Sequence, residues 1–312
     1  MFLLDYKRIK FFDDAFIATI STTIIAFIST LLSVYNFFTV FSNQRFNNSF
    51  GVFMKFRLLG IFIQSLVVLF YVSPITAFAE TFNLGYFHKF MGQLMAFGFN
   101  FSLFISLSTS ANRFMAIAFP ILYMKIFNSQ VVRKIVVVSM LMALSISCVQ
   151  FIDKCGMFYD AKTFIWFYED SPCAAFINFW LDYLTGLLTV FLCLLVDFFT
   201  LLFLVKRKYF DRKLKNITKS TNAQEHVIKL TDVLFYVQSG LHNILTALSL
   251  VSFHYLSSFA NSDLELFVTV GLIFALAPLI DNTLIFLFNI NPAIKTIKVQ
   301  KIIVTKTSKN YS

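Results

Sequence analysis

Several ionisable side chains lie within or at the end of long apolar stretches of this 312-residue sequence. Arg113 follows one apolar run and precedes Pro120, whereas Asp197 and Asp281 lie inside two others. An ionised side chain at the centre of a bilayer costs about 2.5–3.5 kcal/mol, so such residues usually pair or face a polar interior. The pattern favours the pairing of buried charges. For Arg113 alone, the alternative is that it has no buried partner and that its side chain extends from a helix end to the membrane–water interface.

Enzyme chemistry finds no support in the sequence. The four histidines, His88, His226, His242 and His254, are scattered, and no spacing matches zinc ligands, an activated nucleophile or a phosphate-binding loop. No lysine lies in the last apolar run, so a retinal Schiff base is not expected either. We therefore expect a protein that is not an enzyme and that holds no metal and no cofactor.

Composition indicates the class of protein. Hydrophobic residues make up 58% of the chain and charged residues 13%, against about 45–50% and 25% in soluble domains. A helix that crosses the hydrocarbon needs about 20 apolar residues. The sequence therefore predicts an all-α membrane protein, a bundle of seven transmembrane helices. The second helix could begin before its apolar run, near Ser49. The expected spans are Ala15–Phe41, Leu58–Phe78, Phe90–Ser110, Ile135–Ile152, Phe176–Val205, Val233–Tyr255 and Leu266–Phe288.

The distribution of charge predicts the orientation. Of the 26 basic residues, 20 fall in or beside one set of loops and the C-terminal segment, which the positive-inside rule assigns to the cytoplasm. We expect an extracellular N-terminus over 1–14, a seven-transmembrane domain over 15–290 and a cytoplasmic basic tail over 291–312. The net charge of +10 then reflects topology and a surface for anionic lipid or an acidic partner, not nucleic acid.

Two cysteines flank the expected outer loop from 153 to 175. Cys155 and Cys173 would lie on the oxidising side of the membrane, where two exposed free thiols would be reactive. A disulfide between them is the expected arrangement, and two unpaired cysteines are the alternative.

The end of the third expected span resembles a signature of rhodopsin-like G-protein-coupled receptors. Arg113, Ile117 and Pro120 match the pattern Asp-Arg-Tyr-x-x-Ile-x-x-Pro, in which Asn112 and Phe114 replace the acid and the tyrosine. In that superfamily the pattern lies at the cytoplasmic end of the third helix.

Further motifs, in order along nearly the whole chain, resemble the nematode serpentine receptor class X chemoreceptors. They are Asn48-Ser49-Phe50-Gly51, Pro74-Ile75-Thr76, Gly92-Gln93, Ala111-Asn112-Arg113-Phe114, Asp153-Lys154-Cys155, Phe158-Tyr159-Asp160, Pro172-Cys173, Leu181-Asp182-Tyr183, Asp197, Gln238-Ser239 and Asp281. The resemblance implies a chemosensory receptor of the plasma membrane, such as that of a sensory neuron. It would bind a small extracellular ligand and activate a heterotrimeric G protein.

The sequence also departs from the family's pattern. Lys55 and Arg57 fall where the family usually has apolar or small residues, which leaves the geometry at the start of the second helix open. The neutral residue before Arg113 means that another acid must hold this arginine in a resting state. Asp197 is the expected partner, and the alternative is a protonated Asp197 hydrogen-bonded to a hydroxyl or a carbonyl.

The seventh span completes the expected activation switch. Asp281 could join Asn282 in a polar interior site, because two such side chains are costly in hydrocarbon. Phe286 replaces the tyrosine of the superfamily's seventh-helix motif, so a switch at this point would have to work differently.

Ligand contacts are expected in the outer half of the bundle, where helical spacing turns one set of side chains inward. Each candidate alone is more often a packing or helix–helix contact. Together they predict a mostly apolar, aromatic pocket that suits a small, weakly polar ligand. The candidates are Gln93, Phe97, Asn100, Asp182, Ser252 and Phe253.

The G-protein surface is expected on the cytoplasmic face, although contact with anionic lipid is the plain alternative for its cations. A seven-span ligand-gated channel or small-solute transporter is the alternative function, and it would need a polar stripe or paired broken helices. A receptor that no longer signals is a third interpretation. The expected contact residues are Arg113, Pro120, Lys125, Arg133, Lys206, Arg207 and Lys208.

Overall fold

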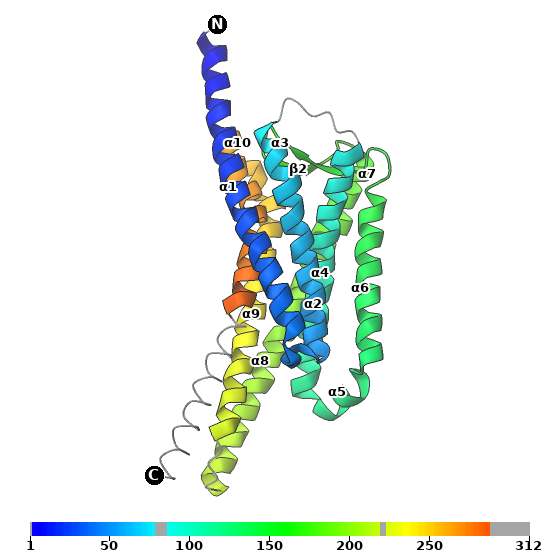
Figure 1. The fold of residues 1–312 in the computed structure, drawn as a ribbon. Helices are drawn as coiled ribbons and strands as arrows, with labels where there is room; N and C mark the ends of the chain where they lie inside the picture. Colours follow the sequence, from blue (N-terminus) through cyan, green and yellow to red (C-terminus); the bar gives the residue numbers. More distant parts are fainter. Residues whose placement is uncertain (1, 79–85, 219–222, 288–312) are drawn as a thin grey trace, which may run out of the picture.

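The computed structural model describes residues 2–78, 86–218 and 223–287, with side chains described over 14–44, 46–78, 86–206 and 238–287. The chain forms an elongated bundle of long helices with a two-stranded sheet across one end (Figure 1). α1 (Phe2–Ser42) projects beyond that end, and α8 (Thr185–Thr218) and α9 (Ala223–His254) project beyond the other. We call these the sheet end and the opposite end.

The described residues form seven long helical rods, so the predicted all-α seven-helix bundle is confirmed, while the orientation of its termini stays a prediction. Within the described part of the chain, six rods are long and apolar enough to cross a membrane, and α9 occupies the place of the expected sixth span. The other elements are η1 (Gln44–Phe46), α2 (Ser49–Val67), η2 (Val68–Val72), α3 (Ser73–Ala77), α4 (Tyr86–Ala118), α5 (Pro120–Ile126), α6 (Ser129–Val149), β1 (Met157–Asp160), β2 (Ile165–Tyr168), α7 (Pro172–Phe176), η3 (Ile177–Leu184), η4 (Leu256–Phe259), α10 (Asp263–Leu266) and η5 (Phe267–Gly271). The seventh rod continues from η5 through residues 272–287.

The second rod begins well before its apolar run. The Asn48 side chain accepts a hydrogen bond from the backbone N–H of Gly51 at 2.9 Å and caps α2 at Ser49, because asparagine is a favoured N-cap residue. The expected start at Leu58 is therefore wrong, and the alternative start near Ser49 is confirmed. As a result Arg57 lies in the body of a helix.

α2 and α4 approach each other closely because two glycines face each other at their crossing. A Cβ atom built on Gly60 would lie 2.9 Å from the carbonyl oxygen of Gly98, and one built on Gly98 would lie 3.0 Å from the carbonyl oxygen of Gly60. Small residues at helix crossings let backbones pack directly in membrane proteins. α4 thereby becomes the central rod, with a long buried face.

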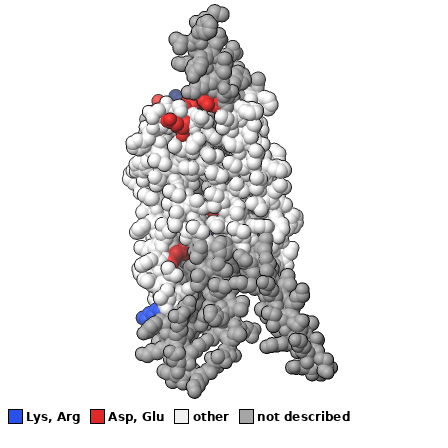
Figure 2. Space-filling view, turned by 90° about the vertical axis from the view of Figure 1, so that its left-hand side faces the viewer, with Lys and Arg blue, Asp and Glu red and all other residues white. Residues whose placement is uncertain are grey.

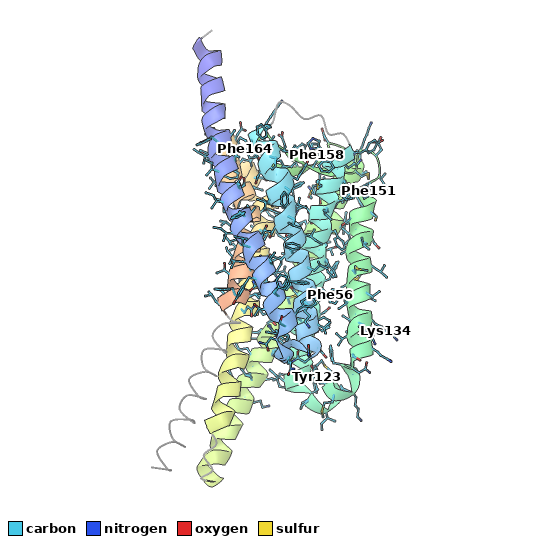
Figure 3. The ribbon with its side chains drawn as sticks, in the orientation of Figure 1. Phe56, Tyr123, Lys134, Phe151, Phe158 and Phe164 are labelled. Atoms are coloured by element: carbon cyan, nitrogen blue, oxygen red, sulfur yellow. A yellow bond between two sulfur atoms is a disulfide. The ribbon has the colours of Figure 1, made fainter. Side chains whose placement is uncertain are left out.

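The outward faces of the bundle are apolar. Phe16 of α1 is 66% exposed and Phe198 of α8 is 58% exposed. Figure 2 shows a broad uncharged band, with acidic residues gathered near the sheet end. The basic residue Lys134 lies near the opposite end, where its side chain points away from α6 (Figure 3). This surface matches a bundle that is surrounded by lipid.

The sheet is a hairpin that lies across one end of the bundle. β1 and β2 pair antiparallel, with Met157 opposite Tyr168 and Tyr159 opposite Trp166. The Tyr159 hydroxyl lies 2.8 Å from the Thr76 hydroxyl of α3. A Cβ atom on Gly92 of α4 would lie 1.9 Å from the carbonyl oxygen of Met157, so β1 rests directly on the helix backbone.

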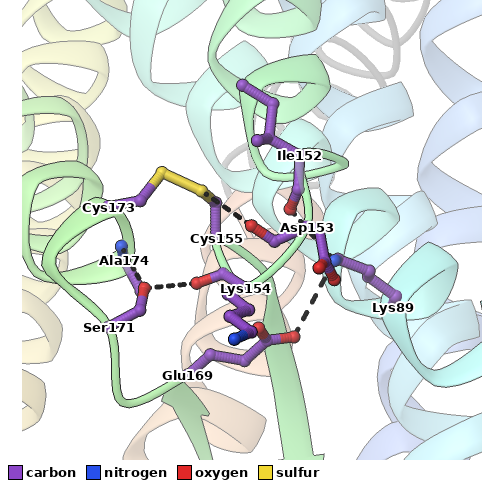
Figure 4. Close-up of a disulfide and its surroundings, with 9 residues drawn as sticks. All are labelled: Lys89, Ile152, Asp153, Lys154, Cys155, Glu169, Ser171, Cys173 and Ala174. Atoms are coloured by element: carbon purple, nitrogen blue, oxygen red, sulfur yellow. Dashed lines mark hydrogen bonds and ion pairs between the residues drawn. A yellow bond between two sulfur atoms is a disulfide. The ribbon is translucent and has the colours of Figure 1, made fainter.

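The disulfide between Cys155 and Cys173 is present, which confirms the prediction (Figure 4). It joins the residue two positions before β1 to the first turn of α7. Ser171 reinforces the same junction, because its hydroxyl donates to the carbonyl oxygen of Lys154 and accepts from the N–H of Ala174. The hairpin is thus fastened to the rods on both sides by a covalent bond and by backbone contacts.

Candidate ligand cavity and polar core

A buried ion pair joins the second and seventh rods. Arg57 Nη2 lies 3.1 Å from Asp281 Oδ1, and the two side chains are 7% and 10% exposed. The same oxygen lies 2.6 Å from Nδ1 of His242 on α9, whose Nε2 lies 3.0 Å from the Ser106 hydroxyl of α4. A neutral imidazole that donates from Nδ1 and accepts at Nε2 would leave one cation and one anion in the cluster. One carboxylate therefore connects four rods.

Asn282, the next residue of the seventh rod, continues these contacts to α1. Its Nδ2 lies 2.7 Å from the Ser33 hydroxyl and 3.1 Å from the Ser29 hydroxyl. Asn36 Nδ2 donates to the carbonyl oxygen of Asn282 at 2.8 Å, and the Ser29 hydroxyl reaches that of Ser65 on α2 at 2.8 Å. Buried polar groups in hydrocarbon need such partners.

The carboxylate of Asp197 on α8 forms a second centre. Asn243, the neighbour of His242 on α9, donates from Nδ2 to Asp197 Oδ2 at 2.9 Å. We call the two centres, with the Asn282 cluster, the polar core. Two consecutive residues of α9 thus contact both of its acids.

Arg113 lies at the opposite end of α4 from the hairpin. Its side chain is 8% exposed, and its guanidinium carbon lies 4.8 Å from the centre of the Phe50 ring on α2, a distance at which a cation is attracted to the ring face. Beyond it, Pro120 begins α5 and Lys125 lies in the last turn of that helix.

A cavity lies between the hairpin and the helical turns nearest the sheet end of the bundle. It comprises about 410 Å³ of empty space, part of it open to solvent. Its walls are mostly apolar or aromatic. It is lined by Met95, Ala96 and Phe99 of α4, Met157, Trp166 and Tyr168 of the hairpin, Asp182 of η3, Leu250, Phe253 and His254 of α9, and Phe274 of the seventh rod.

The polar side chains of the cavity meet on one side. The Tyr168 hydroxyl donates to Asp182 Oδ2 at 2.9 Å, and burial raises the pKa of Tyr168 well above its ordinary value, so this hydroxyl stays a donor. His254 Nε2 lies 3.9 Å from the same carboxylate oxygen. The imidazole of His254 also packs on Tyr183, with ring centres 4.7 Å apart.

The sequence of residues 9–289 matches the family of serpentine type seven-transmembrane G-protein-coupled chemoreceptors named Srx. The chain belongs to the Srx family. A relative, serpentine receptor class X 45 of Caenorhabditis elegans, is 23% identical over 243 residues, which are 76% of this chain and 66% of the relative. The Srx chain thus spans just under two thirds of that relative's length.

The fold of the Srx chain is also that of a solved receptor. The crystal structure of squid rhodopsin superposes with a TM-score of 0.65 over 87% of this chain and 81% of that one, at 14% sequence identity. Family and fold together identify a multi-pass membrane protein of the serpentine receptor class, which is not an enzyme.

Only part of the expected ligand set of the Srx chain lines the cavity. Asp182 and Phe253 do. Phe97 instead stacks on Phe101 with ring centres 5.6 Å apart, and the Ser252 hydroxyl donates to the carbonyl oxygen of Thr269. Gln93 and Asn100 are buried, at 3% and 1% exposure, outside the lining of this cavity. Ligand contact by any of these residues stays a prediction.

Asp197, Asp281 and Asn282 of the expected switch lie in the polar core, but with partners that the sequence did not indicate. Asp281 pairs with Arg57 and His242, and Asp197 with Asn243. Phe286 packs edge-on against Tyr35, with ring centres 5.2 Å apart. The proposed pairing of Arg113 with Asp197 stays a prediction.

The expected G-protein contacts lie at the opposite end from the hairpin. Pro120, Lys125, Arg133 and Lys206 are exposed there, and Arg133 Nε donates to the carbonyl oxygen of Ser129 at 3.3 Å. The backbone of the expected basic loop is largely helical in α8 and α9. The side chains of Arg207 and Lys208 and the tail over 291–312 lie outside the described residues.

Sequence reasoning missed Arg57, His242, Asn243 and His254, and it also missed Tyr168 and the other residues of the cavity apart from Asp182 and Phe253. An apolar run that begins at Leu58 leaves Arg57 outside the second span. The N-cap signal of Asn48 before Ser49 could have placed it inside the helix. The histidines carried no usable spacing, since their partners come from other rods.

Proposed function

We propose that this Srx chain binds a small extracellular ligand in the cavity under the hairpin and activates a heterotrimeric G protein at the opposite end. The observation that carries the proposal is the position of α9. Phe253 and His254 at its outer end line the cavity, and His242 and Asn243 on the same helix contact both acids of the polar core. Twelve residues of helix, or about 18 Å, separate His254 from His242.

A ligand in the cavity would act on α9 as a rigid rod. If it prefers a state in which the outer end of α9 is displaced, the contacts of His242 and Asn243 must change as well, because both lie on the same helix. Hydrogen bonds to charged groups contribute about 1.5–3 kcal/mol each, and coupling between receptor sites is typically about 1–3 kcal/mol. Rearranging a single contact of this kind is therefore enough for a population shift between two packings of the bundle.

In this proposal, the population shift changes the packing of the helices around Arg113. In the proposed orientation the N-terminus is outside, so Arg113 and the exposed cations Lys125, Arg133 and Lys206 face the cytoplasm. Movement of the inner part of α9 away from α4 would open a cleft that Arg113 lines. A surface of this charge suits an acidic segment of a partner protein.

The test expresses the full chain with a cytoplasmic G-protein activation sensor and screens pooled volatile and water-soluble compounds. We expect a response in the parent that Arg113→Ala abolishes at equal surface expression. Lys162→Ala is the matched control, because it removes an exposed cation in the hairpin turn, far from the proposed G-protein surface. A response that Arg113→Ala leaves unchanged would contradict the role of this residue. A ligand-evoked current without sensor activation would identify a channel instead.

A further inference from the structure

Asp182 Oδ2 and His254 Nε2 lie 3.9 Å apart at the polar side of the cavity. With the histidine proton on Nδ1, both atoms are hydrogen-bond acceptors. The distance is too long for a direct hydrogen bond. Among the residues with described side chains, His254 Nε2 has no hydrogen-bond partner although it is buried. A donor group about 3 Å from both atoms would satisfy both of them at once.

The charge of this corner is negative and is not neutralised by a strong base. Within the described side chains, no lysine or arginine lies within 4.0 Å of Asp182, whose side chain is 16% exposed. A carboxylate in an apolar setting is costly unless a cation or several donors accompany it. Tyr168 supplies one donor. The remaining deficit favours a cationic ligand over a neutral one and disfavours an anionic one.

The walls around this corner also favour a cation. Trp166 and Phe253 line the same cavity, and Tyr168 and Phe253 pack edge-on with ring centres 6.4 Å apart. Aromatic rings attract ammonium groups through their faces and provide contact area for an apolar body.

We propose that the ligand of this cavity is a small organic amine, whose protonated nitrogen bridges Asp182 Oδ2 and His254 Nε2 while its apolar part packs among the aromatic side chains. This proposal rests on the ligand site of the proposed function and names its ligand class. The bridge needs two N–H groups on one nitrogen. Primary and secondary ammonium groups provide them, whereas an alcohol has one donor and no charge, and a quaternary ammonium has no donor.

The first test measures direct binding and needs no G protein. The melting temperature of the purified full chain in lipid nanodiscs is followed against the concentration of 2-phenylethylamine, 2-phenylethanol and trimethyl(2-phenylethyl)ammonium. We expect the amine to raise the melting temperature with an apparent affinity about 10- to 100-fold higher than that of the other two compounds. Equal effects of amine and alcohol, or no shift by the amine or by shorter primary amines up to their solubility limits, would overturn the proposal.

Variants separate the proposed contacts from a structural role of the same residues. Asp182→Asn keeps an acceptor for the Tyr168 hydroxyl but removes the charge, and it should lose the amine's advantage over the alcohol. His254→Phe keeps a ring against Tyr183 and should weaken amine binding while alcohol binding is unchanged. Asp263→Asn removes the same charge from an exposed site outside this cavity, and it should bind the amine like the parent. Amine binding that survives Asp182→Asn would overturn the proposal even if His254→Phe fails to fold.

The same probes distinguish this inference from the proposed function. Amine binding that depends on Asp182 but never activates the G-protein sensor would support the ligand class and contradict the signalling role. Sensor activation by neutral compounds that is indifferent to Asp182→Asn would support the signalling role and overturn the ligand class.

Discussion

The hairpin end and the polar core hold the same bundle together by different means. The hairpin is fixed by the Cys155–Cys173 disulfide, by its backbone ladder and by the direct contact of β1 with α4 at Gly92. The polar core depends on side-chain hydrogen bonds between rods, centred on Asp281 and Asp197. A covalent frame suits a cavity of constant shape, whereas exchangeable side-chain bonds suit a region that has two arrangements.

The largest effect should come from breaking the ion pair of the polar core. Arg57→Leu leaves Asp281 buried with only His242, and removing one partner of a buried pair costs about 3–5 kcal/mol. We expect a strongly lowered melting temperature. Lys55→Leu is the matched control, because Lys55 lies on the same helix over the ring of Phe41 and such a contact contributes about 0.5–1 kcal/mol.

A double variant sharpens this prediction. Arg57→Leu with Asp281→Leu removes both charges, so much of the lost stability should return, because replacing a whole buried pair by apolar residues is often neutral. If the stability lost in the double variant equals the sum of the losses in the two single variants, Arg57 and Asp281 do not stabilise the fold as a pair.

Loss of the disulfide should be the next largest effect and should be confined to the hairpin. The bond closes a loop with a sequence separation of 18, for which chain entropy gives about 3 kcal/mol. Cys155→Ser with Cys173→Ser should raise hydrogen exchange in β1 and β2 and abolish ligand binding, while exchange around Asp281 is unchanged. Cys148→Ser, which removes an exposed free thiol of α6, is the control. An equal rise of hydrogen exchange in the polar core would contradict the separation of the hairpin end from the polar core.

A smaller effect is expected from lifting the hairpin off α4. Gly92→Ala puts a Cβ atom 1.9 Å from the carbonyl oxygen of Met157, and such overpacking costs about 1–3 kcal/mol. Ligand affinity should fall while the response at saturating ligand persists. Gly240→Ala is the control, since no described atom lies within 4 Å of its added Cβ and alanine favours a helix by about 0.5–1 kcal/mol.

The smallest effect should come from the outermost bond of the ion-pair cluster. Ser106→Ala removes the hydroxyl that contacts His242 and should cost about 1 kcal/mol. It should change the basal signal of the G-protein sensor more than it changes ligand affinity. Ser108→Ala, whose hydroxyl bonds only to the carbonyl of Phe104 in its own helix among the described contacts, should change neither.

The sequence was sufficient for the features that depend on local composition. Seven apolar runs predict seven rods because the bilayer imposes one length on each of them. The pairing of Cys155 with Cys173 followed from their place in one short loop on the oxidising side. Both predictions need no knowledge of how distant rods meet.

The partners of the buried acids could not be predicted in this way. Arg57 and Asp281 are 224 residues apart, and which side chains meet depends on the rotation of each rod about its axis. The cavity illustrates the same limit: Phe97 and Asn100 were expected to face it, but their preceding neighbours Ala96 and Phe99 do. One residue along a helix is a rotation of about 100°, and hydrophobic periodicity is weak in a helix that is apolar on every side.

The coupling through α9 is tested most directly by the ligand affinity of the receptor with and without G protein. The measurement uses the compound that activates the parent in the sensor assay, and it compares the parent with His242→Phe, in which Arg57 still pairs with Asp281. In the parent we expect the G protein to tighten ligand binding about 5- to 150-fold, as reciprocal coupling requires. In His242→Phe the ligand should still bind while this factor falls toward one. An unchanged factor in the variant would contradict transmission through the polar core.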